Sequence, residues 1–307
     1  MITFRGKRLV VFGCGYVGTA VAQEALRRGL NVTALTRNPE KAASLREQGI
    51  AVQLGDLASR EWHARIPGGA DYVLNAVSSG GGGVDGYRNS YVDGMHSIAD
   101  WATAGGGVGT IVYTSSTSVY PQDHAAIVTE SDKTEGSGEL PQLLIEAEKI
   151  LLSEDWSNSS SNKKPGSIRR GFVLRLAGIY GPGRTHLIDQ VRSGSVSGNP
   201  DHHLNLAHRD DIARAIWATF ESSPSLDGGI FNVADDGAAR KGEITEWLAQ
   251  QLRVPAPTFT GLPVAGRRAV TPDRIISNAK LKAVLNWQPL FPTFREGYKN
   301  MLALNTE

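Results

Sequence analysis

Short apolar stretches rich in β-branched residues alternate with amphipathic helical patterns along the first two-thirds of the chain. Helices are predicted from about Val17 to Arg28 and from Pro39 to Gly49, where proline suits a first turn and glycine a C-terminal cap. Strands that alternate with helices at this spacing favour a parallel, doubly wound α/β sheet with right-handed crossovers. The predicted strands cover residues 8–12, 31–36, 50–54, 71–77, 110–115 and 170–176.

The alternation becomes looser after Tyr180. A helix at 209–222 is followed by a strand at 229–234, and a second helix covers 242–252. The tail after these elements reads as two short helices around a proline-bounded turn. This part of the chain therefore looks like a smaller lobe interleaved with the end of the sheet.

The polar segment 153–167 interrupts the alternating pattern, and its serines, asparagines and prolines predict an exposed loop. Because the pattern resumes beyond it, we interpret it as an insertion and not as a domain boundary. We expect a first domain of residues 1–180 that includes strand 229–234. The smaller lobe would be residues 181–307 without that strand.

Composition places the chain among ordinary soluble proteins, with 40% hydrophobic and 21% charged residues in 307. A net charge of +1 argues against nucleic acid or an anionic membrane as the main partner. Cys14 is the only cysteine, so no intrachain disulfide can form, and we interpret it as a small loop residue. The apolar run at the N-terminus is too short for a signal-peptide core of roughly 7–15 residues. We expect a cytoplasmic protein.

The segment GCGYVG follows the first strand and opens the first helix, which is the position of a dinucleotide-binding loop. Gly13 would allow the tight turn, Gly15 would let the backbone approach a pyrophosphate, and Gly18 would let helix and strand pack closely. The helix N-terminus at Tyr16 and Val17 would present N–H groups to the phosphates. A purely structural glycine turn is the alternative.

The second strand ends at Thr36 and is followed by Arg37, with no acidic residue before Glu40. NAD sites usually carry Asp or Glu here to bind the ribose 2′-hydroxyl. An arginine instead can pair with a 2′-phosphate through two parallel hydrogen bonds. The sequence therefore favours NADP, with NAD as the alternative if Arg37 is only a solvated loop charge.

Two further segments belong to the predicted cofactor site. Asp56 and Leu57 follow the third strand in GDL, where the carboxylate could meet the adenine. Ala76, Val77 and Ser78 follow the fourth strand and lead into a glycine run that would let the backbone pass close to the cofactor.

These motifs, taken in order, resemble the extended short-chain dehydrogenase/reductase family, the group of nucleotide-sugar epimerases and dehydratases. The resemblance runs from about residue 8 to 303. It implies a Rossmann dinucleotide-binding domain and a small C-terminal substrate lobe, with the substrate between them. The matching segments are GCGYVG (13–18), GDL (55–57), NAV (75–77), YTSSTSVYP (113–121), LRLAGIYGPGR (174–184), NLAHRDDIARA (205–215), FNVADD (231–236) and SNAKLKAVLNWQP (277–289).

Catalysis in that family usually rests on a Ser or Thr, a Tyr, and a Lys four residues after the Tyr. A neighbouring ammonium is needed because a tyrosine with a pKa of about 10 is a poor base on its own. The resemblance assigns the serine to Ser116. When the family's helix glutamate is matched to Glu148, the lysine position falls on Leu144 and the tyrosine position on Leu140. The chain therefore resembles an atypical subgroup that lacks the Tyr–Lys pair.

Other residues could take part in the chemistry. Tyr120 and His186 are weaker candidates for an acid or base, and each has a structural alternative as a packing or surface residue. Arg184 lies in the segment that borders the substrate in the family, and could bind an anionic group or form a surface ion pair. The segment DHH (201–203) together with His208 matches no standard spacing of metal ligands, so no metal site is predicted.

Two functions remain open from the sequence. The first is an NADP-dependent oxidoreductase or epimerase/dehydratase-like enzyme on an unknown carbonyl or sugar-nucleotide substrate, with non-standard acid and base residues. Loss of a general acid–base pair would cost roughly 10²–10⁴ in rate. The second is a dinucleotide-binding sensor or regulatory protein with little or no catalysis. The resemblance also implies a homodimer as one assembly.

Overall fold

The computed structural model describes residues 3–153, 168–261 and 272–304, so nearly all of the expected loop at 153–167 lies outside the described residues. The chain forms two compact units. Unit 1 comprises Met1–Val119, Thr134–Arg175 and Ala213–Phe231, and unit 2 comprises Tyr120–Lys133, Leu176–Ile212 and Asn232–Glu307. These boundaries differ from the expected ones, because 120–133 joins the second unit and 213–231 joins the first.

Unit 1 is built on a seven-stranded sheet in the order β12-β7-β5-β4-β1-β2-β3. The pairs along β3-β2-β1-β4-β5 are parallel, as the alternating strand and helix pattern predicts. The fold class is therefore the predicted doubly wound α/β arrangement. The strands are β1 (Arg8–Phe12), β2 (Asn31–Thr36), β3 (Ala51–Leu54), β4 (Ala70–Asn75), β5 (Val108–Ser116), β7 (Ile168–Leu176) and β12 (Gly228–Val233).

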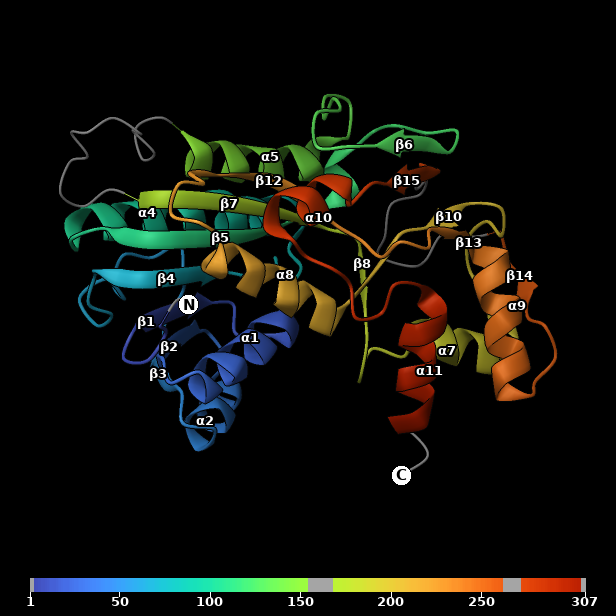
Figure 1. Cartoon of the computed structure of the whole chain (residues 1–307), viewed down its shortest axis with the longest axis horizontal. Coiled ribbons are helices and arrows are strands. Elements are labelled where there is room, and N and C mark those ends of the chain that lie inside the picture. Colours follow the sequence, from blue (N-terminus) through green and yellow to red (C-terminus); the bar gives the residue numbers. More distant parts are fainter. Residues whose placement is uncertain (1–2, 154–167, 262–271, 305–307) are drawn as a thin grey trace. The chain divides into compact units, whose positions relative to one another are not determined.

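Helices cover both faces of this sheet, with α1, α2 and α8 on one side and α4 and α5 on the other (Figure 1). Both faces of a parallel sheet must be covered because its strands are apolar on each side. The helical segments are α1 (Tyr16–Arg27), α2 (Pro39–Glu47), α3 (Gly83–Tyr87), the π-helical turn η1 (Arg88–Asp93), α4 (Gly94–Ala104), the short 3₁₀ turn η2 (Thr117–Val119), α5 (Glu139–Leu152) and α8 (Arg209–Glu221).

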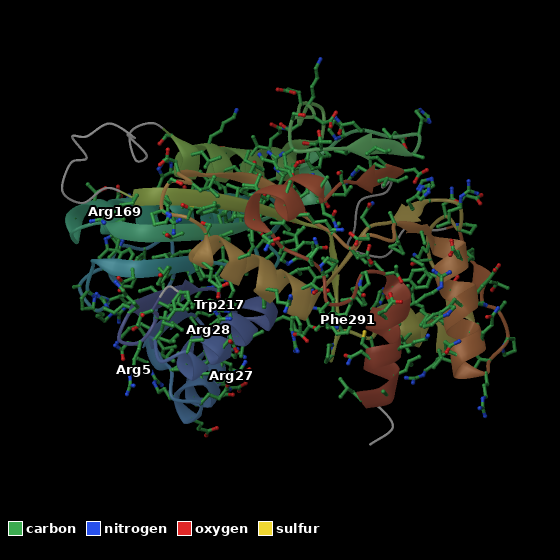
Figure 2. All side chains as sticks on the ribbon, in the orientation of Figure 1. Arg5, Arg27, Arg28, Arg169, Trp217 and Phe291 are labelled. Atoms are coloured by element: carbon green, nitrogen blue, oxygen red, sulfur yellow. The ribbon has the colours of Figure 1, made fainter. Side chains whose placement is uncertain are left out.

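Aromatic packing explains why most of α8 belongs to unit 1. The ring of Trp217 meets Phe4 edge to face at 5.3 Å between centroids, and Phe220 packs on Tyr72 at 4.9 Å. Arg28 from α1 lies over the Trp217 ring with its guanidinium carbon 4.1 Å from the centroid (Figure 2). Large aromatic side chains bury enough area to decide which core a helix joins.

Unit 2 has a core of its own, formed by helices α7, α9 and α11 around Tyr180 and Phe294. The segment 120–133 belongs here because β6 pairs in parallel with β15. The elements of this unit are β6 (Ala126–Val128), β8 (Gly178–Tyr180), α7 (His186–Arg192), β9 (Ser195–Val196), β10 (His203–Leu204), β11 (Leu206–His208), β13 (Ala239–Arg240), α9 (Lys241–Leu252), β14 (Thr258–Phe259), β15 (Arg274–Ile276), α10 (Ala279–Leu285) and α11 (Phe294–Leu304).

Among the described residues, none of the helices combines the length and the apolar character that a bilayer span would require. The same residues contain no group of three or more His, Cys, Asp or Glu side chains placed to hold a metal ion.

Candidate functional site: a dinucleotide pocket in unit 1

The three glycines of the loop between β1 and α1 have distinct structural roles. Gly13 has a φ of +82°, and a Cβ there would come within 2.5 Å of the backbone of Ala76 and Val77. A Cβ on Gly18 would lie 2.4 Å from the carbonyl oxygen of Gly13, so helix and loop could not pack as they do. A Cβ on Gly15 would meet nothing within 4 Å. The first and third glycines are therefore required by the fold, whereas Gly15 leaves an open approach to the backbone.

The N-terminus of α1 suits an anionic ligand. Its N-cap is Gly15, which provides no side-chain hydrogen bond, and the first turn contains no acidic residue. Backbone N–H groups and the helix dipole at such an end favour a phosphate. These observations agree with the predicted phosphate-binding loop.

Cys14 lies inside this loop but is buried, with 3% of its surface exposed. Burial raises the pKa of its thiol, and the Sγ atom lies 3.8 Å from the hydroxyl oxygen of Thr19. A thiol that stays protonated is a weak nucleophile. The structure therefore favours the interpretation of Cys14 as a small packing residue.

A pocket of about 360 Å³ opens beside this loop. Its lining includes the predicted residues Gly13, Gly15, Arg37, Asp56, Leu57, Val77 and Ser78. The predicted residues Tyr16, Val17, Gly18 and Ala76 are not part of its lining. The lining residues that sequence reasoning did not include are Phe12, Cys14, Leu35, Thr36, Asn38, Lys41, Gly55 and Ser90.

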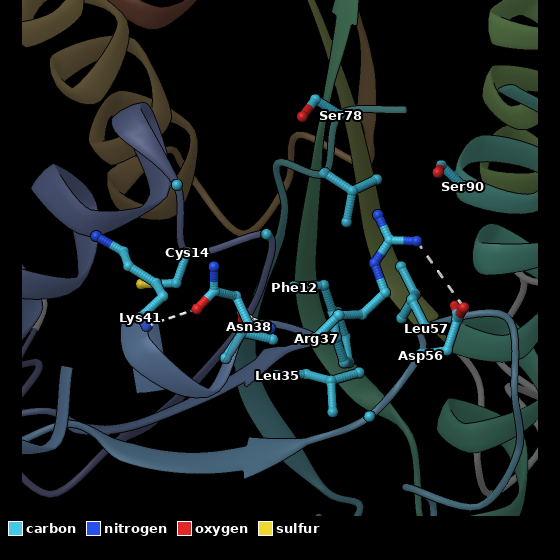
Figure 3. Close-up of a pocket in the computed structure, with 15 residues that line it drawn as sticks. Phe12, Cys14, Leu35, Arg37, Asn38, Lys41, Asp56, Leu57, Ser78 and Ser90 are labelled. Atoms are coloured by element: carbon cyan, nitrogen blue, oxygen red, sulfur yellow. Dashed lines mark hydrogen bonds and ion pairs between the residues drawn. The ribbon is translucent and has the colours of Figure 1, made fainter. Parts of the chain in front are cut away.

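Two cationic side chains line the pocket at the end of β2 (Figure 3). Arg37 follows the strand directly, and Lys41 lies on the first turn of α2, which Asn38 caps by accepting a hydrogen bond from the Lys41 N–H at 2.9 Å. This cap fixes where α2 begins and so places Lys41 at the pocket. A basic residue four positions after Arg37 was the sequence signal for it.

Asp56 is the only acidic side chain in the described lining, and it faces Arg37 across the pocket (Figure 3). The guanidinium Nη1 and the carboxylate Oδ2 lie 4.0 Å apart, and both side chains are about half exposed. Such a pair is weak because solvent screens it. Arg37 is therefore free to exchange this contact for a stronger one with a ligand anion.

These features fit a dinucleotide. Backbone N–H groups at the open Gly15 corner suit a pyrophosphate, and the cations at the end of β2 suit a further anionic group. The end of β2 carries Thr36 where a ribose-binding carboxylate would stand in an NAD site.

Ser116 ends β5, the strand next to β4 in the sheet. Its Oγ accepts a hydrogen bond from the Ser118 N–H at 3.1 Å. The hydroxyl proton of Ser116 therefore remains available to a ligand oxygen. Ser116 does not itself line the described pocket.

Helix α5 is apolar at positions 140 and 144, to which the family resemblance assigns the tyrosine and the lysine. Leu144 is buried with 4% exposure, and Leu140 is half-buried. The helix contains no tyrosine, and its lysine, Lys149, is exposed. Glu146 pairs with Arg88 at the surface, with 3.4 Å between Oε1 and Nη1. Helix α5 therefore contains no tyrosine–lysine pair.

Glu148 is a buried residue of α5 with a structural role. Its carboxylate accepts hydrogen bonds from the Arg175 guanidinium, the shortest 2.6 Å long, and from the Ser115 hydroxyl at 2.6 Å. The Glu148 and Arg175 side chains are 3% and 5% exposed. This buried ion pair ties α5 to β5 and β7.

The remaining predicted site residues lie in unit 2. Tyr120 is fully buried, and its hydroxyl donates to Asn232 Oδ1 at 2.8 Å, which favours a packing role. His186 and Arg184 are exposed around the start of α7, and Gln190 Nε2 lies 3.2 Å from His186 Nε2. The small cavity described in this unit is lined by other residues.

Three buried titratable groups line that small cavity, His208, Asp211 and Asp235. Asp211 Oδ2 accepts a hydrogen bond from the Phe291 N–H at 3.0 Å. Burial raises the pKa of Asp235 to about 7 and lowers the pKa of His208 to about 4. His208 Nδ1 accepts the Asp210 N–H at 3.2 Å, so its 3.8 Å contact with the Asp210 carboxylate is not an ion pair in the neutral form. His208 Nε2 and Asp235 Oδ2 have no hydrogen-bond partner within the described chain.

The sequence profile of the NAD dependent epimerase/dehydratase family matches residues 9–234. This range begins within β1 and ends just after β12, so it includes the whole pocket and Ser116.

Solved structures of similar fold cover almost the whole chain. A functionally unknown conserved protein from Silicibacter pomeroyi is 23% identical, with a TM-score of 0.73 over 97% of this chain and 98% of that one. UDP-glucuronic acid 4-epimerase from Bacillus cereus, solved with UDP-glucuronic acid and NAD, is 16% identical with a TM-score of 0.78 over 97% and 99%. The dTDP-glucose 4,6-dehydratase of Streptomyces venezuelae, solved with NAD, is 17% identical with a TM-score of 0.79 over 97% of each chain.

One curated protein matches over a short stretch. UDP-N-acetylmuramoylalanine–D-glutamate ligase from Rhizobium meliloti is 37% identical over 62 residues, which are 20% of this chain and 13% of that protein. Because the match spans so little of the ligase, it says nothing of a shared activity.

Proposed function

The chain belongs to the NAD-dependent epimerase/dehydratase family, and we propose that it is an enzyme of this family that uses NADP. The substrate class we propose is a carbonyl compound or a sugar nucleotide, handled by acid and base residues other than a Tyr–Lys pair. The observation that carries the cofactor part is Arg37, which lines the pocket at the end of β2 with no carboxylate beside it on that strand.

Charge supports NADP over NAD. A 2′-phosphate adds about two negative charges, which a carboxylate at the end of β2 would repel and a guanidinium would bind through two hydrogen bonds. The ion pair that Arg37 makes with Asp56 is long and half exposed, so a phosphate can replace that contact at little cost. Lys41 adds a second cation to the same pocket.

The cofactor proposal is tested by titrating the protein with NADPH and NADH and following nucleotide fluorescence. We expect tighter binding of NADPH, and Arg37→Ala should weaken NADPH binding by about 10–100-fold, the value of a charged hydrogen-bonded contact. Arg27→Ala is the control, since Arg27 is an exposed arginine of the same unit that pairs with Glu24 on α1. Equal affinity for the two nucleotides would refute the proposal.

Ser116 is the residue of this chain that we propose for orienting substrate. Its oxygen already accepts the Ser118 N–H, so its own proton can be donated to a substrate oxygen. The dinucleotide, when bound, supplies hydride transfer. The side chains of α5 offer no acid at Leu140 or Leu144, so the proton must come from another group or from water.

The buried position of Leu144 favours a second candidate, a dinucleotide-binding protein with little catalysis. A panel of sugar nucleotides and simple carbonyls, followed by NADPH oxidation, separates the two functions. Turnover that is lost in Ser116→Ala but kept in Ser118→Ala supports the enzyme, since Ser118 contributes its backbone N–H and not its side chain. Tight NADPH binding without turnover across the panel supports the binding protein.

A further inference from the structure

We propose that Tyr91 is a positioning residue for cofactor selection, because its hydroxyl holds the backbone segment against which the Arg37 guanidinium lies. The inference rests on the proposed function, in which Arg37 binds the 2′-phosphate. It extends that function to a residue that does not line the pocket and lies 54 positions further along the chain.

The hydroxyl of Tyr91 accepts a hydrogen bond from the Ser79 N–H at 3.2 Å. Ser79 lies between Ser78, which lines the pocket, and Gly80, which approaches Arg37. The residue before Tyr91, Ser90, lines the same pocket. Tyr91 therefore joins the two backbone segments that form this side of the pocket.

The segment that Tyr91 holds has little conformational restraint of its own. Gly80, Gly81, Gly82 and Gly83 all have positive φ, between +59° and +106°. Glycine loses more conformational freedom on ordering than any other residue, so such a run needs fixed points to keep one shape. The hydrogen bond at Ser79 is one such point at its N-terminal end.

Arg37 depends on that shape. A Cβ on Gly80 would lie 3.4 Å from Arg37 Nη2, so the guanidinium lies beside Gly80. Asp56 Oδ2 is 4.0 Å away from Nη1 (Figure 3). The Arg37 side chain is 56% exposed, so burial does not fix its direction. The loop backbone and one weak ion pair set where the guanidinium points.

Tyr91 itself is firmly placed. It is buried, with 9% exposure, within the π-helical turn η1, which packs against α5. Its ring packs against that of Tyr87 with 5.1 Å between centroids. Turns of this kind are frequent at functional sites.

The experiment compares the affinities for NADPH and NADH in the wild type, Tyr91→Phe, Arg37→Ala and the double variant. We expect Tyr91→Phe to lower the NADPH/NADH selectivity about fivefold, the value of one neutral hydrogen bond, with NADH affinity nearly unchanged. In the Arg37→Ala background the same substitution should leave the selectivity where Arg37→Ala has set it. Tyr87→Phe is the matched control, because it removes a hydroxyl from the neighbouring ring.

Equal weakening of both nucleotides by Tyr91→Phe, or a loss of selectivity that persists without Arg37, would overturn the inference. Gly80→Ala tests it from the loop, since an L-residue at a φ of +65° strains the backbone beside Arg37, and it should lower the selectivity in the same direction. A wild type without NADPH preference would instead refute the proposed function. If Arg37→Ala abolishes the preference for NADPH whereas Tyr91→Phe and Gly80→Ala leave it intact, only the role of Tyr91 is refuted.

Discussion

Two clusters of buried polar side chains in this protein accommodate their titratable groups in opposite ways. In unit 1, Glu148 and Arg175 are both charged, and the carboxylate is hydrogen-bonded by the guanidinium and by the Ser115 hydroxyl. In unit 2, His208 and Asp235 are equally buried, but each keeps one polar atom without a partner among the described residues. Burial moves their pKa values toward the neutral forms, that of Asp235 upward and that of His208 downward.

The difference shows what a buried charge requires. An ionised group survives away from water only with a close counter-charge and hydrogen bonds, and otherwise becomes neutral. The cluster in unit 1 meets this condition and anchors α5.

The largest expected effect comes from removing one charge of the satisfied cluster. Glu148→Ala should lower the free energy of unfolding by about 3–5 kcal/mol, because Arg175 would remain buried without its partner. Urea denaturation measures this. Glu146→Ala is the control on the same helix; its pair with Arg88 is about half exposed, so we expect a loss of less than about 1 kcal/mol. Equal losses in the two variants would remove the distinction drawn here.

The next effect concerns pH and Asp235. Its pKa is raised from 3.8 to about 7 in the folded chain, so the stability it contributes is fully present below pH 3.8 and is lost as the pH rises to about 7. The shift corresponds to at most about 4 kcal/mol. Asp235→Asn removes this term and keeps an oxygen for the Gly237 N–H. The free energy of unfolding of the variant should therefore increase relative to that of the wild type as the pH rises from 4 to 7.

His208 acts in the opposite direction. Its pKa is lowered from 6.5 to about 4, so its contribution is present above pH 6.5 and is lost as the pH falls toward 4. In the wild type the two slopes oppose each other over this window. His208→Gln should therefore gain stability relative to the wild type as the pH falls from 6.5 to 4. Denaturation curves of both variants at several pH values test the pair: the stability difference from the wild type should rise with pH for Asp235→Asn and fall with pH for His208→Gln, and two slopes of the same sign would contradict it.

The smallest effect lies again in unit 1. Ser115→Ala removes one hydrogen bond to the Glu148 carboxylate but leaves the ion pair intact. We expect a loss of about 1.5–2 kcal/mol in the free energy of unfolding, the value of a hydrogen bond to a charged group. In the double variant with Glu148→Ala the serine should contribute little, since its acceptor is gone. A fully additive loss would show that Ser115 acts independently of the cluster.

Much of the fold could be predicted from the sequence. The ranges predicted for β1 and β2 agree with the structure at both ends, and that for α8 agrees to within one residue. Periodicity succeeds for these elements because each buries one face or both in a regular way. It missed the segment from α3 to α4, since the glycine run and the π-helical turn η1 have no fixed repeat.

The candidate site was predictable in part. Gly13, Gly15 and Arg37 could be assigned to the pocket from the sequence, because they lie in the turns that directly follow β1 and β2. Lys41 reached the pocket through the start of α2, and Ser90 through η1, so their roles depend on where those elements begin and pack. The division into units also departed from the expected boundaries, because Trp217 and Phe220 carry their helix into the core of unit 1.

The sequence by itself determined the doubly wound sheet, the phosphate loop and the absence of a tyrosine on α5, because local periodicity, glycine spacing and residue identity are properties of the chain alone. Only the tertiary structure decided that Glu148 is an anchor and that Tyr91 reaches Ser79. It also decided that burial shifts the pKa of Asp235 upward and that of His208 downward. Those outcomes depend on burial and on partners distant in sequence, and no local pattern of residues encodes either.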